Sequence, residues 1–416
     1  MPFADYSAAI QWLFSTQLFG IKLGLDGPKN LLRQYLANPT RGVKVIHVAG
    51  TNGKGSTCAF VDAVARASGL RTGLFTSPHL IDYRERIKVS GADIPEEECL
   101  RHLNALHTLC ASLETHPTFF EITLALAMKY FAERECELII LETGMGGRLD
   151  ATTAVPADVC VITPIGLDHT QWLGDTISAI AGEKAAIICA EKPVVSAPQP
   201  ADAGRVIAME ANEKRAPLTI VDEPLCGYPL SLKGAHQPWN AAVALAALHA
   251  LGLNLRYDAV QYGLSHTDWP GRFETFRRAG EATIILDGAH NPHAAEVLAE
   301  TWQTEFPTAS PILLFSAVSS KDVSGVLALL APIAREIHLC PVNSPRTLSC
   351  SELHQALPSD CNCAKICEHE NFLAALQAAR VSADSTSSPI LIAGSLYLVG
   401  QARATLLDST FQPSAQ

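Results

Sequence analysis

The residues best suited to chemistry lie in a glycine-rich segment near the N-terminus, Gly50 to Ser56 (GTNGKGS). An apolar, β-branched run over 43–48 predicts a buried strand before it, and helically spaced apolar residues follow as far as Ser68. In the order strand, glycine loop and helix, the N–H groups of the loop and the positive end of the helix point at one place, which favours the binding of a phosphate. Lys54 could neutralise its charge, and Ser56 could hold Mg²⁺. The alternative is a tight glycine turn beside a lysine, since Gly55 makes the spacing differ from the common P-loop.

Further polar side chains follow other predicted strands. Glu142 ends the apolar run 137–142, Ser77 follows 71–75, and His169 follows 158–163. Because parallel strands end at one sheet edge, Glu142 suits Mg²⁺ and His169 suits a metal or phosphate. Ser77 fits a metal ligand and a Ser-Pro turn equally well. Lys184, on a predicted helix over 177–188, would ordinarily be a surface charge.

Several other residues have good structural explanations. Thr118 and Glu121 have capping-box spacing at the start of a predicted helix that continues to about Glu135. The spacing favours Phe120 as a core residue over a ring that stacks on a flat ligand. Asn240 precedes a predicted helix over 241–251, which it could cap. Arg86, in a polar stretch, is expected to be solvated.

The chain order predicts an α/β protein with two parallel sheets. A helix is expected over 5–19, a glycine-punctuated loop over 19–25 and a short helix over 31–36. A turn-rich segment, 268–274, separates two patterns, so the domains are predicted as 1–275 and 280–416. The second begins with a strand over 283–287, and strands near 312–315, 336–340 and 390–393 alternate with helices. Residues 382–388 are expected to form a polar loop.

Composition limits the classes of partner. The 416-residue chain has 31 basic and 42 acidic side chains, a formal charge of −11, which argues against nucleic acid or an anionic membrane. The N-terminus lacks the basic region of a signal peptide, so a cytoplasmic protein is expected. The 12 cysteines of the chain are then expected to be reduced thiols. The spacings of Cys350, Cys361, Cys363 and Cys367, near His354 and His369, match no paired zinc-binding pattern, so no zinc site is expected there.

Many separate segments, in order, carry a resemblance to one family. They are GTNGKGS, TSPHL, FFEIT, LETGMGGRLDAT, IGLDHT, EKAAI, HQPWNA, PGRFE, LDGAHNPHA and GSLYLVG. Together they resemble the folylpolyglutamate synthases of the Mur ligase superfamily, in particular the bacterial bifunctional dihydrofolate synthases. The resemblance implies a P-loop-containing N-terminal ATPase domain with a parallel sheet and a smaller Rossmann-like C-terminal α/β domain.

The same resemblance implies an ATP-dependent amide ligase of folate biosynthesis. Such an enzyme adds L-glutamate to dihydropteroate, forming dihydrofolate, and to reduced folates, forming folylpolyglutamates. The γ-phosphoryl group of ATP converts the substrate carboxylate into an acyl phosphate, glutamate attacks it, and ADP and phosphate are released. ATP and two Mg²⁺ ions are the implied cofactors, and a monomer is expected.

Roles are transferred by matching motifs. The resemblance implies that the ATP phosphates are bound by Asn52, Gly53, Lys54, Gly55 and Ser56, and that further ATP contacts come from Asn240, Arg272, Asp287 and His290. It implies that magnesium is bound by Ser77, Glu142 and His169. The implied pterin-binding residues are Thr118, Phe120 and Asp150. Lys184 matches a lysine that these ligases carbamylate, which would let it hold the second Mg²⁺. Lys54, His169 and Lys184 are the implied catalytic residues. Departures from the family pattern are Ser319–Asp322 (SSKD), in place of Asp-Lys-Asp, and Thr153, in place of asparagine.

Two other classes of protein compete with this interpretation. A ligase that extends a cell-wall peptide usually has an additional N-terminal domain, whereas only about 40 residues precede this P-loop. A P-loop kinase or regulatory NTPase would need no second domain that carries Asp287 and His290.

Overall fold

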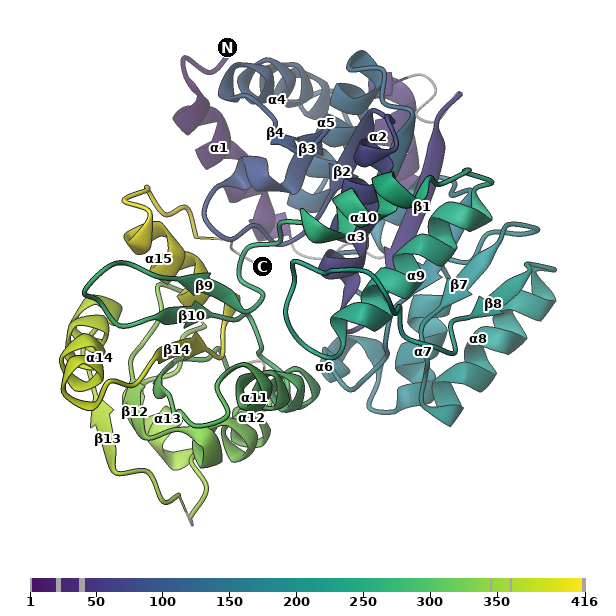
Figure 1. Cartoon of the computed structure of the whole chain (residues 1–416). Helices are drawn as coiled ribbons and strands as arrows, with labels where there is room; N and C mark the ends of the chain where they lie inside the picture. The colour runs from purple at the N-terminus through teal and green to yellow at the C-terminus, as the bar shows by residue number, and fades with distance from the viewer. Residues whose placement is uncertain are drawn as a thin grey trace.

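Two mainly parallel sheets, each covered by helices on both faces, make up the protein (Figure 1). The computed structural model describes residues 2–19, 24–36, 42–319, 321–344, 346–359 and 361–413. The predicted α/β class is confirmed. The predicted 19–25 loop lies largely outside the described residues.

The first sheet has the order β4-β3-β2-β5-β1-β6-β7-β8. Its strands are β1 (Lys44–Ala49), β2 (Thr72–Phe75), β3 (Ile87–Val89), β4 (Ala92–Asp93), β5 (Leu138–Glu142), β6 (Val159–Ile162), β7 (Val194–Ser196) and β8 (Leu218–Ile220). Its pairings are parallel except those that join β3 to β2 and β4 to β3. The glycine segment follows β1, whose neighbours are β5 and β6, so β5 brings Glu142 to the same edge.

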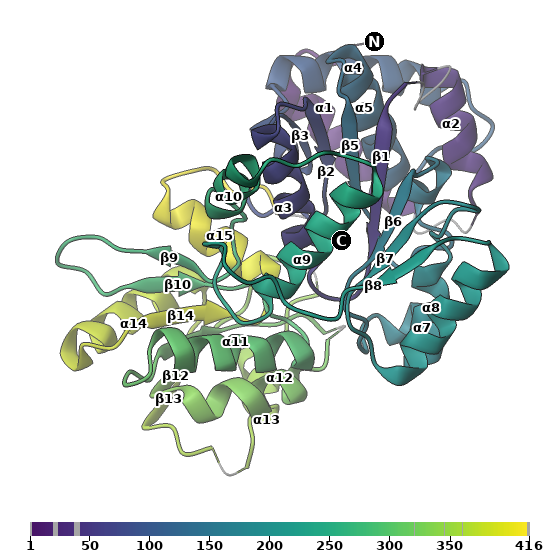
Figure 2. The same cartoon turned by 45° about the vertical axis from the view of Figure 1, so that its right-hand side comes forward.

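Helices cover both faces of this sheet because its strands alternate their buried side chains between two cores. One face packs against α1 (Tyr6–Ser15), α2 (Asp26–Leu36), α4 (Glu96–Cys110), α5 (Phe119–Glu133), α7 (Ile177–Ala185) and α8 (Ala201–Glu213). The other packs against α3 (Lys54–Ala67), α9 (Gln237–Ala250) and α10 (Tyr257–Ser265), which lie together in Figure 2. The short α6 (Thr170–Leu173) follows His169.

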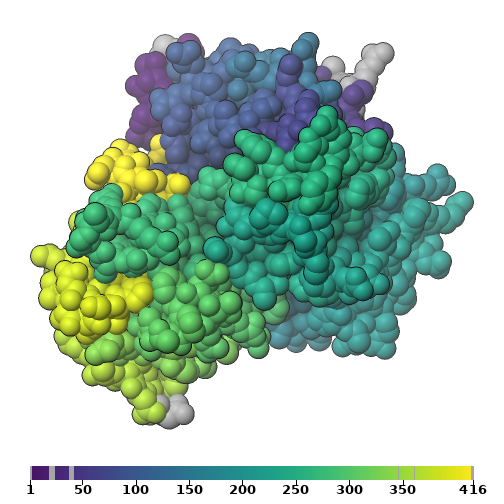
Figure 3. Space-filling view, viewed as in Figure 1, coloured from purple at the N-terminus to yellow at the C-terminus, as the bar shows by residue number. Residues whose placement is uncertain are grey.

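The second sheet has the order β13-β12-β11-β14-β10-β9, with only the β9–β10 pairing antiparallel. Its strands are β9 (Glu274–Phe276), β10 (Ile284–Leu286), β11 (Ile312–Phe315), β12 (Glu336–Leu339), β13 (Lys365–Glu368) and β14 (Ile390–Ala393). One face packs against α11 (Pro292–Glu305), α12 (Val323–Leu330) and α13 (Cys350–Gln355), and the other against α14 (Phe372–Thr386) and α15 (Leu396–Leu406). The two parts of the molecule touch directly (Figure 3). The predicted boundary after residue 275 falls within β9, which begins at Glu274. The division into 1–275 and 280–416 stays a prediction.

Three local predictions were wrong. Residues 382–386 continue α14 instead of forming a loop, because buried Ala379 and Ala383 hold its last turns on the sheet. Asn240 lies inside the first turn of α9, whose N-cap is His236. Arg86 is fully buried, where its guanidinium donates to His79 Nδ1 at 2.8 Å and lies over the Phe119 ring.

Candidate active site

The glycine segment forms a loop that leaves the start of α3 open. Gly53 is the N-cap of α3, with φ of 83°, and it offers no side-chain cap. A Cβ there would lie 2.6 Å from Oδ1 of Asn240, so a larger residue would both strain the backbone and collide. Lys54 is the first residue of the helix, and its Nζ donates to the carbonyls of Gly50 and Thr51 at 3.2 and 3.3 Å. An anion at this helix start would meet free N–H groups and Lys54 together.

Lys184 is not a surface charge. It lies buried on α7, and its Nζ donates to the Gly50 carbonyl at 2.7 Å. Lys54 donates to the same carbonyl, so two amino groups meet at one oxygen. Burial and the Lys54 charge lower the pKa of Lys184 to about 7. A large share of Lys184 is therefore a neutral, nucleophilic amine near neutral pH.

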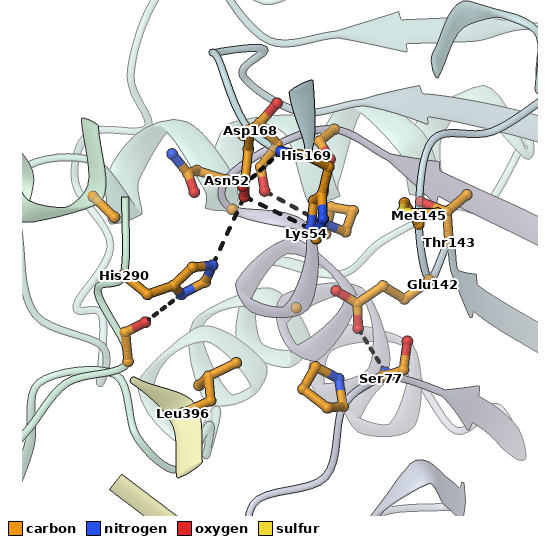
Figure 4. Close-up of a pocket in the computed structure, with 18 of the residues that line it drawn as sticks. Asn52, Lys54, Ser77, Glu142, Thr143, Met145, Asp168, His169, His290 and Leu396 are labelled. Carbon is orange, nitrogen blue, oxygen red and sulfur yellow. Dashed lines mark hydrogen bonds and ion pairs between the residues drawn. The ribbon is translucent and has the colours of Figure 1, made fainter. Parts of the chain in front are cut away.

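Ser77 and Glu142 form an oxygen-rich corner of the site. They face each other in Figure 4, and the Ser77 backbone N–H donates to Glu142 Oε2 at 3.1 Å. Glu142 is buried, which raises its pKa against the opposing effect of the Lys54 charge. The buried Ser77 hydroxyl has no hydrogen-bond partner within the described residues. An unpartnered hydroxyl beside a buried carboxylate fits a hard cation such as Mg²⁺.

His169 joins this edge from the loop after β6. It has φ of 51° and precedes α6. Although 42% of its side chain is exposed, desolvation by the surrounding protein and the nearby Lys321 charge lower its pKa to about 4. The imidazole is therefore neutral at physiological pH, as a metal ligand must be.

Asp168 links the two sheets. Its carboxylate lies 2.7 Å from Lys321 Nζ and 3.8 Å from His290 Nε2, both in the second part of the chain. Burial alone would raise the pKa of Asp168, but the nearby His290 imidazole and the Lys321 charge lower it well below its usual range. Asp168 thus remains ionised and attracts two groups of the second part.

A second link uses the P-loop itself. Asn52 Nδ2 donates to Asn291 Oδ1 at 3.3 Å and lies 2.8 Å from His293 Nδ1, while Asn291 Nδ2 donates to Asn52 Oδ1 at 3.1 Å. No role was predicted for Asp168, Asn291, His293 or Lys321. They stand in or beside recognised motifs, but only the fold shows which distant residues they meet.

Asp287 and Arg272 surround the start of the second part. The Asp287 carboxylate accepts the N–H groups of Phe273 and Ala289 at 2.8 and 2.9 Å. Burial raises its pKa, and Arg272 opposes that rise. His290 Nδ1 lies 2.8 Å from the Gly288 carbonyl oxygen, which leaves its Nε2 directed toward Asp168. The Asp287 contacts hold the loop after β10 in shape, and from that loop His290 reaches Asp168 in the first part.

The predicted pterin residues border the same space. Thr118 caps α5 in a capping box with Glu121, as predicted. Phe120 is half-buried and its ring lies 5.5 Å from that of Phe75. Asp150 is buried, and its carboxylate accepts the N–H groups of Gly144, Met145 and Thr152. Asp150 therefore holds its own loop in shape, and its contact with substrate stays a prediction.

All the predicted site residues line one cavity of about 660 Å³ between the two sheets. They are Asn52, Gly53, Lys54, Gly55, Ser56, Ser77, Thr118, Phe120, Glu142, Asp150, His169, Lys184, Asn240, Arg272, Asp287 and His290. The fold thus gathers residues from both parts of the chain, while their individual ligands stay predictions.

Comparisons with known proteins agree with this geometry. Residues 48–197 match the Mur ligase middle domain, and residues 271–396 match the Mur ligase glutamate ligase domain. The dihydrofolate synthase/folylpolyglutamate synthase of Bacillus subtilis is 34% identical over 97% of this chain and 100% of its own length.

Solved structures show the same fold. The Mycobacterium tuberculosis folylpolyglutamate synthase complexed with ADP has a TM-score of 0.89 and 31% identity, covering 98% of this chain and 100% of that one. The Yersinia pestis bifunctional folylpolyglutamate synthase/dihydrofolate synthase complexed with AMPPNP and a Mn ion has a TM-score of 0.86 and 33% identity, covering 97% and 98%. The chain therefore belongs to the dihydrofolate synthase/folylpolyglutamate synthase family of Mur ligases, which confirms the predicted family.

Proposed function

We propose that this protein is an ATP-dependent ligase that adds L-glutamate to dihydropteroate and to reduced folates, in folate biosynthesis. Membership of this family indicates the class of reaction. The cavity lined by both parts of the chain, which lies beside the open start of α3, supports it. ATP and a divalent metal ion are its cofactors.

The reaction must first activate a carboxylate, because an amine cannot displace an oxide. Transfer of the γ-phosphoryl group makes an acyl phosphate and ADP. The glutamate nitrogen, having lost a proton, then forms the amide bond as phosphate leaves. Lys54 and the α3 start would hold the phosphate charge during both steps. The Asp168–Lys321 and Asn52–Asn291 contacts would keep the two parts closed, which shields the acyl phosphate from water.

Ser77, Glu142 and His169 would hold the metal ion, whose chemistry is to offset the negative charge of the phosphoryl group. Lys184 would be carbamylated: its neutral nitrogen attacks CO₂, a proton is lost, and a carboxylate results. Such a carboxylate could hold a second ion, unlike a bare lysine. The pKa of about 7 supports this modification, because only the unprotonated amine reacts.

Small-molecule substrates are expected to be the main partners, and we propose a monomer located in the cytoplasm. All twelve cysteines are free thiols, which accords with a reducing compartment. No helix in the described part of the chain has the length and apolar character needed to cross a membrane. We also propose 1–275 and 280–416 as the two domains.

The discriminating measurement is phosphate release by the purified protein. A ligase should release phosphate only when ATP, glutamate and dihydropteroate or a reduced folate are all present. A regulatory NTPase would release phosphate without the pterin and glutamate, and that result would contradict the proposal. Separate incubations with dihydropteroate and with a reduced folate establish whether both activities are present.

A further inference from the structure

A group of metal-binding side chains lies away from the cavity, at the β13 edge of the second sheet. β12 pairs with β13 so that His338 stands opposite Cys367. His369 follows two residues later, and alternation along the extended chain puts it on the same face as Cys367. These three residues do not line the cavity described above, so their placement is unrelated to the ATP site.

The three side chains are close enough to share one ion. One ligand atom of each, an imidazole nitrogen of His338 and His369 and the Cys367 sulfur, lie within 4.8 Å of one another. His338 Nδ1 and His369 Nε2 are joined by a hydrogen bond of 2.9 Å, which an ion bound to both nitrogens would replace. Tetrahedral zinc, with bonds of about 2.0–2.3 Å, places its ligand atoms roughly 3.3–3.7 Å apart. Small side-chain rotations would therefore form the site.

The surroundings of the second ring nitrogen of His338 also favour this residue as a metal ligand. Its Nε2 lies 3.7 Å from Glu336 Oε2, and neither atom has a hydrogen-bond partner within the described residues. A metal-binding histidine usually donates its second N–H to a carboxylate, which orients the ring and strengthens the ligand.

We propose that His338, Cys367 and His369 bind a borderline divalent transition-metal ion, zinc in particular, which joins the edge strand β13 to β12. Imidazole nitrogen and thiolate sulfur are the ligands that zinc prefers, and Cys367 would lose its proton to solvent on binding. Cys367 and His369 are only partly buried, so water could fill a fourth position.

A second group of possible metal ligands differs because its carboxylates already form ion pairs. Glu98, His102 and Glu133 also lie within 4.8 Å of one another. Both carboxylates there are already paired, since Arg101 contacts Glu98 and Glu133 and Arg134 contacts Glu98. A cation at that place would have to displace two arginines. At the proposed site the Lys365 charge acts on both histidines, but within the described residues no hydrogen bond joins Lys365 to His338, Cys367 or His369.

Cobalt(II) is a suitable probe, because binding through a thiolate gives a charge-transfer absorption band. The full-length protein, cleared of metal and kept reduced with a non-thiol reductant, is titrated with Co²⁺ in excess Mg²⁺, which saturates oxygen ligands at the ATP site. We expect one equivalent to produce the band, Zn²⁺ to remove it, and Zn²⁺ to raise the melting temperature. The Cys367→Ser variant should lose the band, whereas Cys361→Ser, another half-buried cysteine of the same part, should keep it.

Absence of the band in the wild-type protein, or its survival in Cys367→Ser, would overturn the proposal. Should Cys367→Ser not fold, His369→Gln decides, because His369 is partly exposed and its replacement creates no buried cavity. We expect that variant to bind Co²⁺ at least about tenfold more weakly. Unchanged affinity would also overturn the site. Neither result depends on ligase activity.

Discussion

Each part of the molecule contains an inner strand, a short turn and a helix, but the two helix starts differ. In the first part, β1 leads through Gly53 into α3, and the cap has no side chain. In the second, β10 leads to Asn291, whose Oδ1 accepts the N–H of Ala294 at 2.9 Å and closes the start of α11. The same local architecture thus leaves one helix start free for phosphate and fills the other. The chemical difference lies in the cap residue and in the lysine that follows Gly53.

The largest expected effect comes from removing that lysine. Lys54→Ala should lower the turnover of ligation by at least about 100-fold, because it removes the lysine charge at the open helix start. The fold should persist, since the hydrogen bonds of the Lys54 side chain within the described residues go to loop carbonyls and not to the core. Steady-state kinetics and circular dichroism measure the two quantities, with the surface variant Lys192→Ala as the control. Normal ligation by Lys54→Ala would contradict the phosphate assignment.

Lys184→Ala should be nearly as damaging if the carbamate is the working group. Short carboxylic acids such as acetate should partly restore its activity, but not that of Lys54→Ala. In the wild-type protein, the neutral amine increases as pH rises through about 7, so carbamylation and activity should increase over that range when bicarbonate is supplied. Intact mass spectrometry under bicarbonate measures the modification. Unmodified lysine in fully active protein would rule out the carbamate.

A side chain at the open helix start should have an intermediate effect. Gly53→Ala combines left-handed backbone strain, about 1–2 kcal/mol, with a collision against Asn240. We expect weaker ATP binding by calorimetry as well as lower stability. Gly69→Ala is the matched control, because Gly69 has φ of 89° and open space around its Cβ position. Equal loss of ATP affinity in both variants would show that strain, and not the loop geometry, is responsible.

The closed helix start should give the smallest effect. Asn291→Ala removes a cap, which costs about 1 kcal/mol of unfolding free energy. It also removes the hydrogen bonds to Asn52. Asn371, which caps α14 by accepting the N–H of Ala374 at 3.0 Å, provides the control Asn371→Ala. Chemical denaturation should show a larger loss for Asn291→Ala, and the difference measures the contact between the two parts. Equal losses would mean that this contact adds no stability.

Local signals predicted much of the fold because they depend on neighbouring residues. The run before Gly50 predicted β1, and the spacing of Thr118 and Glu121 predicted the cap of α5, both of which the structure confirms. Arg86 was mispredicted because its burial depends on His79 and Phe119 meeting it in space. The end of α14 was mispredicted because serines that favour a loop are outweighed by alanines packed on the sheet.

Patterns along the chain were enough to predict the strand-turn-helix units, the residues at their turns and the family. These follow from periodicity, glycine conformation and motif order, all of which are local along the chain. Three contacts became visible only in the folded chain: Lys184 shares the Gly50 carbonyl with Lys54, Asp168 meets Lys321, and His338 stands beside Cys367. Those contacts depend on sheet order, strand register and packing between distant segments, and they set the charge of each group by burial and by its neighbours.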